Sequence, residues 1–154
     1  MQGQNWSRYV LARAHLMSDE LAQAEATALE AQQYDYPANN HAVSALRGVI
    51  TLLSGDTSKA REEFTLAAAQ ASDLLDNNSR NFRALDTKGL ALAGLALCGE
   101  GNRRKEAFDA YRSARAINRD AGMVRRVLRL FDKLSEADTR GILREVRGAA
   151  EGTG

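Results

Sequence analysis

Residues 42–67 read AVSALRGVITLLSGDTSKAREEFTLA, and this stretch decides the fold. Two apolar segments flank a Ser-Gly-Asp turn. Glycine suits the residue just past a helix C-terminus, and aspartate or threonine caps the N-terminus that follows. Ala60, Phe64 and Ala67 are spaced four and then three residues apart, which places them on one face of the second segment. The stretch therefore predicts two antiparallel helices joined by a tight turn.

The same spacing of small or apolar residues recurs along the chain. The other copies are Ala24, Ala28 and Ala31, then Ala107, Tyr111 and Ala114, and in a weaker form Ile142, Val146 and Ala149. Successive copies begin 36, 47 and 35 residues apart, so each unit has room for two helices and their turns. A single helical hairpin cannot bury its own apolar face, and stacking at least three of them creates a continuous core.

These repeats predict an all-α fold of about four antiparallel helical hairpins in one domain, residues 1–150, with residues 151–154 as a flexible tail. The units cover about 5–38, 41–78, 81–118 and 121–150. The expected helices are 5–17, 19–34, 41–54, 57–76, 81–98, 103–117, 121–134 and 138–150. The residues expected in the core are Ala24, Ala28, Ala60, Phe64, Ala67, Ala107, Tyr111 and Ala114. The single proline, Pro37, and the abundance of alanine and leucine agree with a helical chain.

Several of these residues resemble the tetratricopeptide repeat family. The residues that carry the resemblance are Gly48, Gly55-Asp56, Ala60, Phe64 and Ala67, then Gly94, Gly101-Asn102, Ala107, Tyr111 and Ala114, and in the first unit Ala12, Ala24, Ala28, Ala31 and Pro37. The resemblance implies a short right-handed superhelix whose concave surface, formed by the first helix of each pair, binds other proteins. Residues 83–134 also resemble the repeat arrays found inside large bacterial signalling proteins.

Basic side chains mark the first helix of each expected pair, whereas the second helices of the first two pairs are acidic. The candidate groove residues are Arg8, His15, Arg47, Arg83, Lys88, Arg126 and Arg129. A concave surface lined by these residues would be positive and would attract an anionic ligand. We therefore predict a protein-protein interaction scaffold that binds a peptide or protein segment of acidic character. In the alternative interpretation, these residues pair with acids on adjacent helices and line no groove.

Other kinds of function stay open at this point. Residues 1–102 carry 8 Lys or Arg and 12 Asp or Glu, whereas residues 103–154 carry 13 and 8, so the net charges are −4 and +5. A basic C-terminal part can bind nucleic acid, although few aromatic side chains interleave with it. A secretion or assembly chaperone of similar repeat content is a further alternative. Self-association through the apolar face of residues 121–134 is another.

The sequence shows no pattern typical of an enzyme or of a cofactor site. It lacks a phosphate-binding glycine loop and a dinucleotide fingerprint, and its two histidines and single cysteine have no metal-ligand spacing. We therefore expect neither catalysis nor a metal nor a cofactor. The N-terminus does not read as a signal peptide, and the longest apolar run is too short to cross a bilayer. Together with the lone cysteine, these features favour a cytoplasmic location and no membrane contact.

Overall fold

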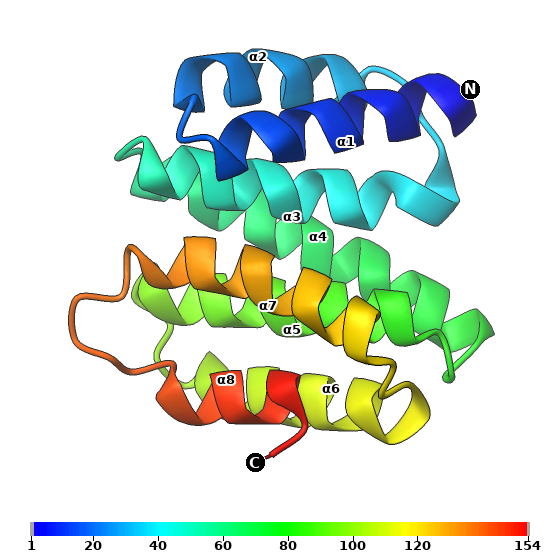
Figure 1. Cartoon of the computed structure of the whole chain (residues 1–154), viewed down its shortest axis with the longest axis vertical. Helices are drawn as coiled ribbons and strands as arrows, with labels where there is room; N and C mark the ends of the chain where they lie inside the picture. Colours follow the sequence, from blue (N-terminus) through cyan, green and yellow to red (C-terminus); the bar gives the residue numbers. More distant parts are fainter. Residues whose placement is uncertain (1, 154) are drawn as a thin grey trace.

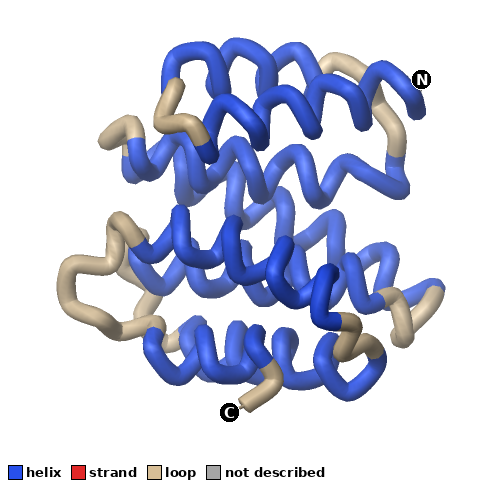
Figure 2. The backbone as a smooth tube through the Cα atoms, in the orientation of Figure 1, coloured by secondary structure: helices blue, strands red, loops and turns tan. Residues whose placement is uncertain are grey.

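The two helices around the Ser-Gly-Asp turn are present in the computed structural model, which describes residues 2–153 (Figure 1). Within these residues the chain forms eight helices and no strand. The helices are α1 (Gln2–Met17), α2 (Leu21–Gln32), α3 (Pro37–Leu53), α4 (Thr57–Asn77), α5 (Phe82–Leu97), α6 (Arg103–Ile117), α7 (Ala121–Ser135) and α8 (Arg144–Glu151). Short loops join them, and Figure 2 shows the largest loop between α7 and α8. The all-α prediction is confirmed for this part of the chain.

Two helix starts, those of α3 and α8, lie farthest from the expected residues. Helix α3 begins at Pro37 and not at residue 41, because proline fits the first helical position, where its missing N–H is not needed. Helix α8 begins at Arg144 and not at residue 138. The carboxylate of Asp138 accepts the N–H groups of Ile142 and Leu143, each at 3.0 Å, and Gly141 has a φ of +67°. These local bonds form a compact loop in place of the first turns of the expected helix.

The first six helices form three antiparallel pairs, α1 with α2, α3 with α4 and α5 with α6. The second helix of one pair packs against the first helix of the next, so α2 contacts α3 and α4 contacts α5. The first helices also contact one another, α1 with α3 and α3 with α5. This arrangement places α1, α3 and α5 along one side of the stack.

The last two helices, in the unit expected over residues 121–150, contact each other but do not continue the regular stack. Helix α8, not α7, packs closely against α6, and α7 instead lies over α3 and α5 (Figure 1). Both helices are strongly amphipathic, and each buries its apolar face at its own place. Phe131 and Leu134 of α7 are buried, and Val146 of α8 is 2% exposed. The apolar face of residues 121–134, for which the sequence left self-association open, is therefore packed in part within the chain.

Aromatic rings against glycines hold the stack together. The ring of Phe64 in α4 is fully buried and touches Gly48 of α3 and Gly94 of α5, while Tyr111 of α6 lies against Gly89 of α5. A Cβ at Gly48 would lie 2.5 Å from Phe64 Cε1, so only glycine permits this approach. The eight residues expected in the core are all at most 1% exposed: Ala24, Ala28, Ala60, Phe64, Ala67, Ala107, Tyr111 and Ala114.

No helix among residues 2–153 combines the length and the hydropathy that spanning a membrane requires.

We expect Gly94→Ala to lower the free energy of unfolding, because the added Cβ would meet a ring that Gly48 already confines from the other side. Overpacking costs about 1–3 kcal/mol, and the better helix propensity of alanine returns only about 1 kcal/mol. Denaturant unfolding would measure the difference. Gly3→Ala is the control, since nothing lies within 4 Å of its Cβ position. The loss should shrink in a Phe64→Leu background, and equal stability of the two alanine variants would contradict this account.

Candidate functional site

A groove of about 840 Å³ opens between α1, α3, α5 and α7. Its lining comes from Trp6, Tyr9, Val10, Arg13, Ala14 and Met17 of α1, His41 and Ala42 of α3, Phe82, Arg83, Asp86, Thr87 and Leu90 of α5, Tyr111 of α6, and Met123, Arg126, Val127, Arg129 and Leu130 of α7. The groove exists because α7 packs tightly only near its C-terminal end, where Phe131 and Leu134 are buried. Its N-terminal half spans the hollow without filling it.

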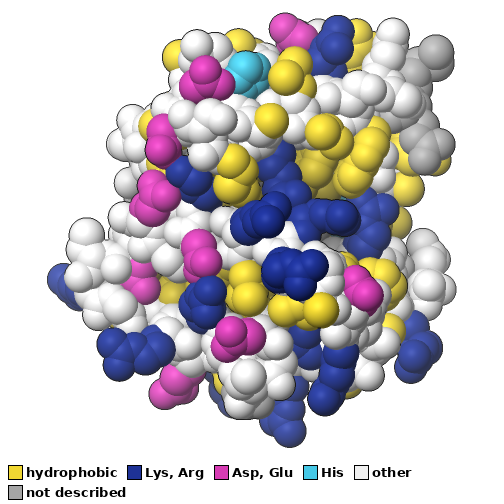
Figure 3. Space-filling view, viewed as in Figure 1, with side chains coloured by type: hydrophobic (Ala, Val, Ile, Leu, Met, Phe, Trp, Pro, Cys, Tyr) yellow, Lys and Arg dark blue, Asp and Glu magenta, His cyan; other side chains and the backbone are white. Residues whose placement is uncertain are grey.

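The groove combines apolar and positively charged surface. Figure 3 shows hydrophobic side chains beside a dense group of lysine and arginine side chains on the face that carries α1 and α7. Two of the apolar lining residues, Trp6 and Val10, are 38% and 51% exposed. Large apolar side chains in this state are typical of surfaces that bind a partner.

Aromatic side chains form the wall of the groove on α1. The rings of Trp6 and Tyr9 stack with their centroids 4.8 Å apart, since residues three apart share a helix face. The guanidinium carbon of Arg83 in α5 lies 5.0 Å from the centre of the Trp6 ring, which is cation–π geometry. Trp6 is the only tryptophan in the chain, so its fluorescence reports on this wall alone.

Four arginines line the groove: Arg13, Arg83, Arg126 and Arg129. Among the described residues, none of them forms an ion pair, whereas Arg8, Arg47, Arg61, Arg103, Arg115 and Arg147 all do. Arg13 donates through Nη2 to the carbonyl oxygen of Arg126 at 2.6 Å, and its buried Nε has no hydrogen-bond partner in this part of the chain. Burial, together with the charges of Arg126 and Arg129, lowers the pKa of Arg13. The groove therefore holds positive charge that no carboxylate among residues 2–153 pairs with.

Asp86 is the one carboxylate among the lining residues, and it is already engaged. Nη2 of the buried Arg115 lies 2.6 and 2.7 Å from its two carboxylate oxygens. Burial raises the pKa of Asp86 to about 6, against the opposing effect of Arg115, so the carboxylate is ionised at neutral pH. Arg115 also donates to the carbonyl oxygen of Ala150 at 3.3 Å, which ties α8 to this pair. The carboxylate of Asp86 is thus paired with Arg115 and does not neutralise the groove arginines.

His41 is held as a neutral ring at the floor of the groove. Its Nε2 lies 3.1 Å from the carbonyl oxygen of Ala38 and must donate there, so Nδ1 accepts from the hydroxyl of Thr87 at 2.8 Å. Burial, with a smaller contribution from the charge of Arg83, lowers the pKa of His41 to about 4. Burial raises the pKa of the Tyr9 hydroxyl, although nearby arginine charges oppose the shift. Neither ring exchanges a proton near neutral pH.

The structure brings three of the seven candidate residues, Arg83, Arg126 and Arg129, to the groove. The other four lie elsewhere. Arg8 pairs with Glu30 at 2.9 Å, His15 lies 2.8 Å from Glu20, Arg47 pairs with Glu63 at 3.1 Å and bonds to Gln32, and Lys88 is half-buried outside the groove lining. For Arg8 and Arg47, the alternative interpretation of pairing with acids on adjacent helices is therefore the one observed, while His15 meets Glu20 in the α1–α2 turn.

Sequence reasoning missed Arg13 and did not assign Trp6 or Tyr9 to the groove. A signal was present, because Trp6, Tyr9 and Arg13 follow one another at helical spacings of three and four residues. The groove candidates expected on α1, Arg8 and His15, pair with Glu30 and Glu20 instead. Tyr9 and Arg13, which line the groove, lie on a face displaced from Arg8 by about one residue, or roughly 100° around the helix.

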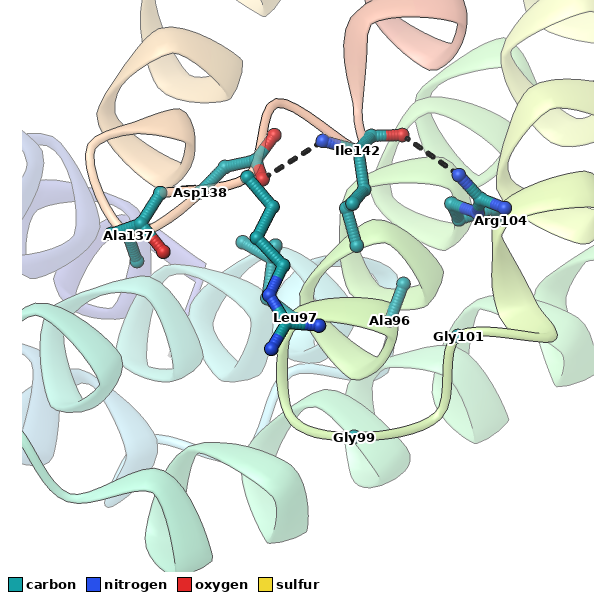
Figure 4. A pocket seen from close by; sticks show the side chains of 10 residues that line it. Ala96, Leu97, Gly99, Gly101, Arg104, Ala137, Asp138 and Ile142 are labelled. Carbon is teal, nitrogen blue, oxygen red and sulfur yellow. Dashed lines mark hydrogen bonds between the residues drawn. The ribbon is translucent and has the colours of Figure 1, made fainter.

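A second hollow of about 470 Å³ lies between the α5–α6 turn and the α7–α8 loop (Figure 4). Its carboxylate, Asp138, is occupied by two backbone N–H groups, and Arg104 reaches the carbonyl oxygen of Ile142 at 3.5 Å. These bonds hold the loop in place and leave Asp138 engaged. No cluster of three or more potential metal ligands occurs within residues 2–153. The arginine-lined groove is therefore the stronger candidate site.

No protein-family model and no curated protein sequence matches this chain.

We expect the stability that depends on His41 to fall as the pH is lowered from about 6.5 to 4. The folded pKa lies near 4 and the ordinary value is 6.5, so in this window the unfolded chain binds a proton that the folded chain does not. Stability is fully present above pH 6.5, and the loss amounts to about 3 kcal/mol at most.

Unfolding free energies of the protein and of His41→Gln, compared between pH 4 and 7, would measure this effect. Asp86 titrates in the same window with the opposite sign, because its folded pKa is raised, but it is present in both proteins and cancels in the difference. The stability advantage of the protein over the variant should decrease toward pH 4. A difference that stays constant with pH would contradict the assignment of a neutral, buried His41.

Proposed function

We propose that this chain is a tetratricopeptide-type interaction module that binds an acidic peptide segment in the groove between α1, α3, α5 and α7. The observation that carries the proposal is the set of four groove arginines that form no ion pair within residues 2–153. Three stacked helix pairs, with Gly48 and Gly94 against Phe64, support the repeat type. The chain's function is thus to hold a segment of another protein, and it needs neither a metal nor a cofactor to do so.

The lining defines the chemistry of the ligand. Carboxylate side chains would accept charge-assisted hydrogen bonds from Arg83, Arg126 and Arg129, which are about twice as strong as neutral ones. An apolar side chain between these carboxylates would occupy the hollow bordered by Tyr9 and Val127. A volume of about 840 Å³ is large enough for one such side chain with its neighbouring backbone. The best ligand therefore alternates acidic and apolar residues.

Binding is favoured over catalysis by the protonation chemistry of the groove. A general acid or base works best with a pKa near the operating pH. The pKa of His41 is about 4, that of Tyr9 is raised, and Asp86 is locked to the buried Arg115. None of these three residues is therefore a candidate for carrying a proton to and from a substrate at neutral pH.

We expect a short synthetic peptide that alternates glutamate and leucine to bind and to change the fluorescence of Trp6. Arg83→Glu should weaken this binding at least about tenfold, equivalent to about 1.4 kcal/mol, because it replaces a donor by a like charge. Fluorescence anisotropy of a labelled peptide would measure affinity independently of Trp6. Arg112→Glu is the matched control, since Arg112 is exposed on α6 outside the groove lining and should leave affinity unchanged.

Three comparison ligands define the specificity. A lysine–leucine peptide tests charge, a glutamate–serine peptide tests the apolar contribution, and a single-stranded oligonucleotide tests phosphate binding. Only the glutamate–leucine peptide should bind tightly, with an affinity that falls as salt rises. Equal binding by Arg83→Glu and Arg112→Glu would contradict the proposed groove. Tighter binding of the oligonucleotide than of the peptide would favour the nucleic-acid alternative.

A further inference from the structure

The first helix pair, α1 with α2, carries most of the exposed apolar side chains. Among the described residues five large hydrophobic side chains are exposed, and four of them belong to this pair: Trp6, Val10, Leu11 and Leu29. Trp6 and Val10 border the groove, whereas Leu11 and Leu29, each 45% exposed, lie outside its lining. Large apolar side chains grouped in this way are typical of a surface on which another protein packs.

Both helices of the pair present small or apolar residues to solvent at the spacing of four and then three. These exposed residues, which we call the outer face, are Ser7, Leu11 and Ala14 of α1 and Ala22, Ala26 and Leu29 of α2. Residues at this spacing share one side of a helix. Helix α4 packs inside the stack through the same spacing, with Ala60, Phe64 and Ala67 all buried. The outer face therefore has the pattern of a packing surface, and within residues 2–153 it is exposed.

The two ends of the stack differ in this respect (Figure 1). At the far end, α8 packs on α6 with Val146 buried, and it exposes Arg144, Glu145 and Glu151. Terminal units of a helical stack need such a polar outer side to stay soluble. The α1–α2 end exposes Leu11 and Leu29 instead, so a partner that covers these side chains would complete the stack.

The charges of the two helices indicate which partner fits. Helix α1 contains Arg8 and Arg13 and no carboxylate, whereas α2 contains Glu25 and Glu30 and no lysine or arginine. Arg8 and Glu30 pair at 2.9 Å, which shows that they lie at the same height of the pair, and both remain partly exposed. A matching partner presents an acidic helix to α1 and a basic helix to α2. A second copy of the same helix pair has both.

We propose that two copies of this chain associate through their outer faces, about a two-fold axis that runs parallel to the helices. This axis places α2 of each copy against α1 of the other, in the antiparallel orientation in which α2 packs on α3 within the chain. Leu11 and Leu29 leave water, and Arg8 of one copy faces Glu30 of the other at the same height. The dimer goes beyond the proposed function, because it uses none of the groove arginines.

Sedimentation velocity at increasing protein concentration tests the association. We expect the mass to approach that of two chains, and we expect Leu29→Glu to weaken association at least about tenfold, because it places a charge against an apolar surface. Leu66→Glu is the matched control. Leu66 of α4 is 44% exposed, nearly as much as Leu29, but it lies outside the outer face, so its substitution should leave association unchanged. Circular dichroism would verify that both variants fold.

Charge reversal tests the two-fold arrangement itself. Arg8→Glu alone and Glu30→Arg alone should each associate poorly, because like charges then meet across the axis. A mixture of the two variants should form mixed dimers, since position 8 of each copy again faces an opposite charge at position 30 of the other. Native mass spectrometry separates mixed dimers from dimers of one variant by mass. Adding Leu29→Glu to both variants should abolish the mixed dimer.

The outcomes that would overturn the proposal are specific. A protein that stays monomeric at every concentration excludes the dimer, and equal effects of Leu29→Glu and Leu66→Glu exclude the outer face as its interface. Mixed dimers that are no more abundant than dimers of a single variant exclude the two-fold arrangement. None of these measurements uses the glutamate–leucine peptide, so failure of the dimer and failure of the proposed function are distinguishable.

Discussion

One aromatic ring between two glycines sets the geometry on which the rest of the structure depends. Phe64 of α4 fills the space between Gly48 of α3 and Gly94 of α5, and no room remains for a Cβ on either side. Two helical turns before these glycines, His41 of α3 bonds to Thr87 of α5, again with an offset of 46 residues. Helices α3 and α5 therefore run in register, and the Phe64 ring fixes the distance between them. Their exposed sides become the floor of the groove, and the position of α1 follows from its packing on α3.

Helix α7 leaves the regular stack and lies over this floor, which turns an open surface into a groove. In a regular continuation, α7 would pack against α6 and the floor would stay open to solvent. Instead α8 packs against α6, and Arg115 secures it through the carbonyl oxygen of Ala150. Helix α7 is thereby free to lie over α3 and α5, where Phe131 reaches Tyr111. The groove is enclosed by a helix that belongs to the same chain and carries two of its arginines.

The sequence alone predicts the helices and their core, because these depend on local spacing. The triads around Phe64 and Tyr111 repeat at helical intervals, and glycine or aspartate marks the turns between them. The position of α7 does not follow from such patterns. An amphipathic helix shows which of its faces is buried, and the same face would serve against α6 or across the groove. The starting point of α8 was also hidden, since it depends on the side chain of Asp138 closing a loop.

The site was predictable in character but only partly in its residues. Arg47 and Arg83 both stand on first helices, and the sequence treats them alike. Arg47 meets Glu63 on α4, whereas Arg83 lies over the ring of Trp6, and this difference arises from contacts between distant segments. A stripe of basic residues therefore shows where positive charge runs along a helix, while the fold decides which charges remain free.

The groove keeps its positive charge because its one lining carboxylate, Asp86, pairs with Arg115. Burying Arg115 without a partner would be strongly unfavourable, and Asp86 supplies that partner from the groove side. Arg115 in turn holds α8, whose place on α6 leaves α7 over the groove. The same ion pair thus stabilises the unusual end of the stack and occupies the one carboxylate of the groove lining. Under the proposed function, an anionic partner would complete the charge balance that the fold, by using Asp86 internally, leaves open.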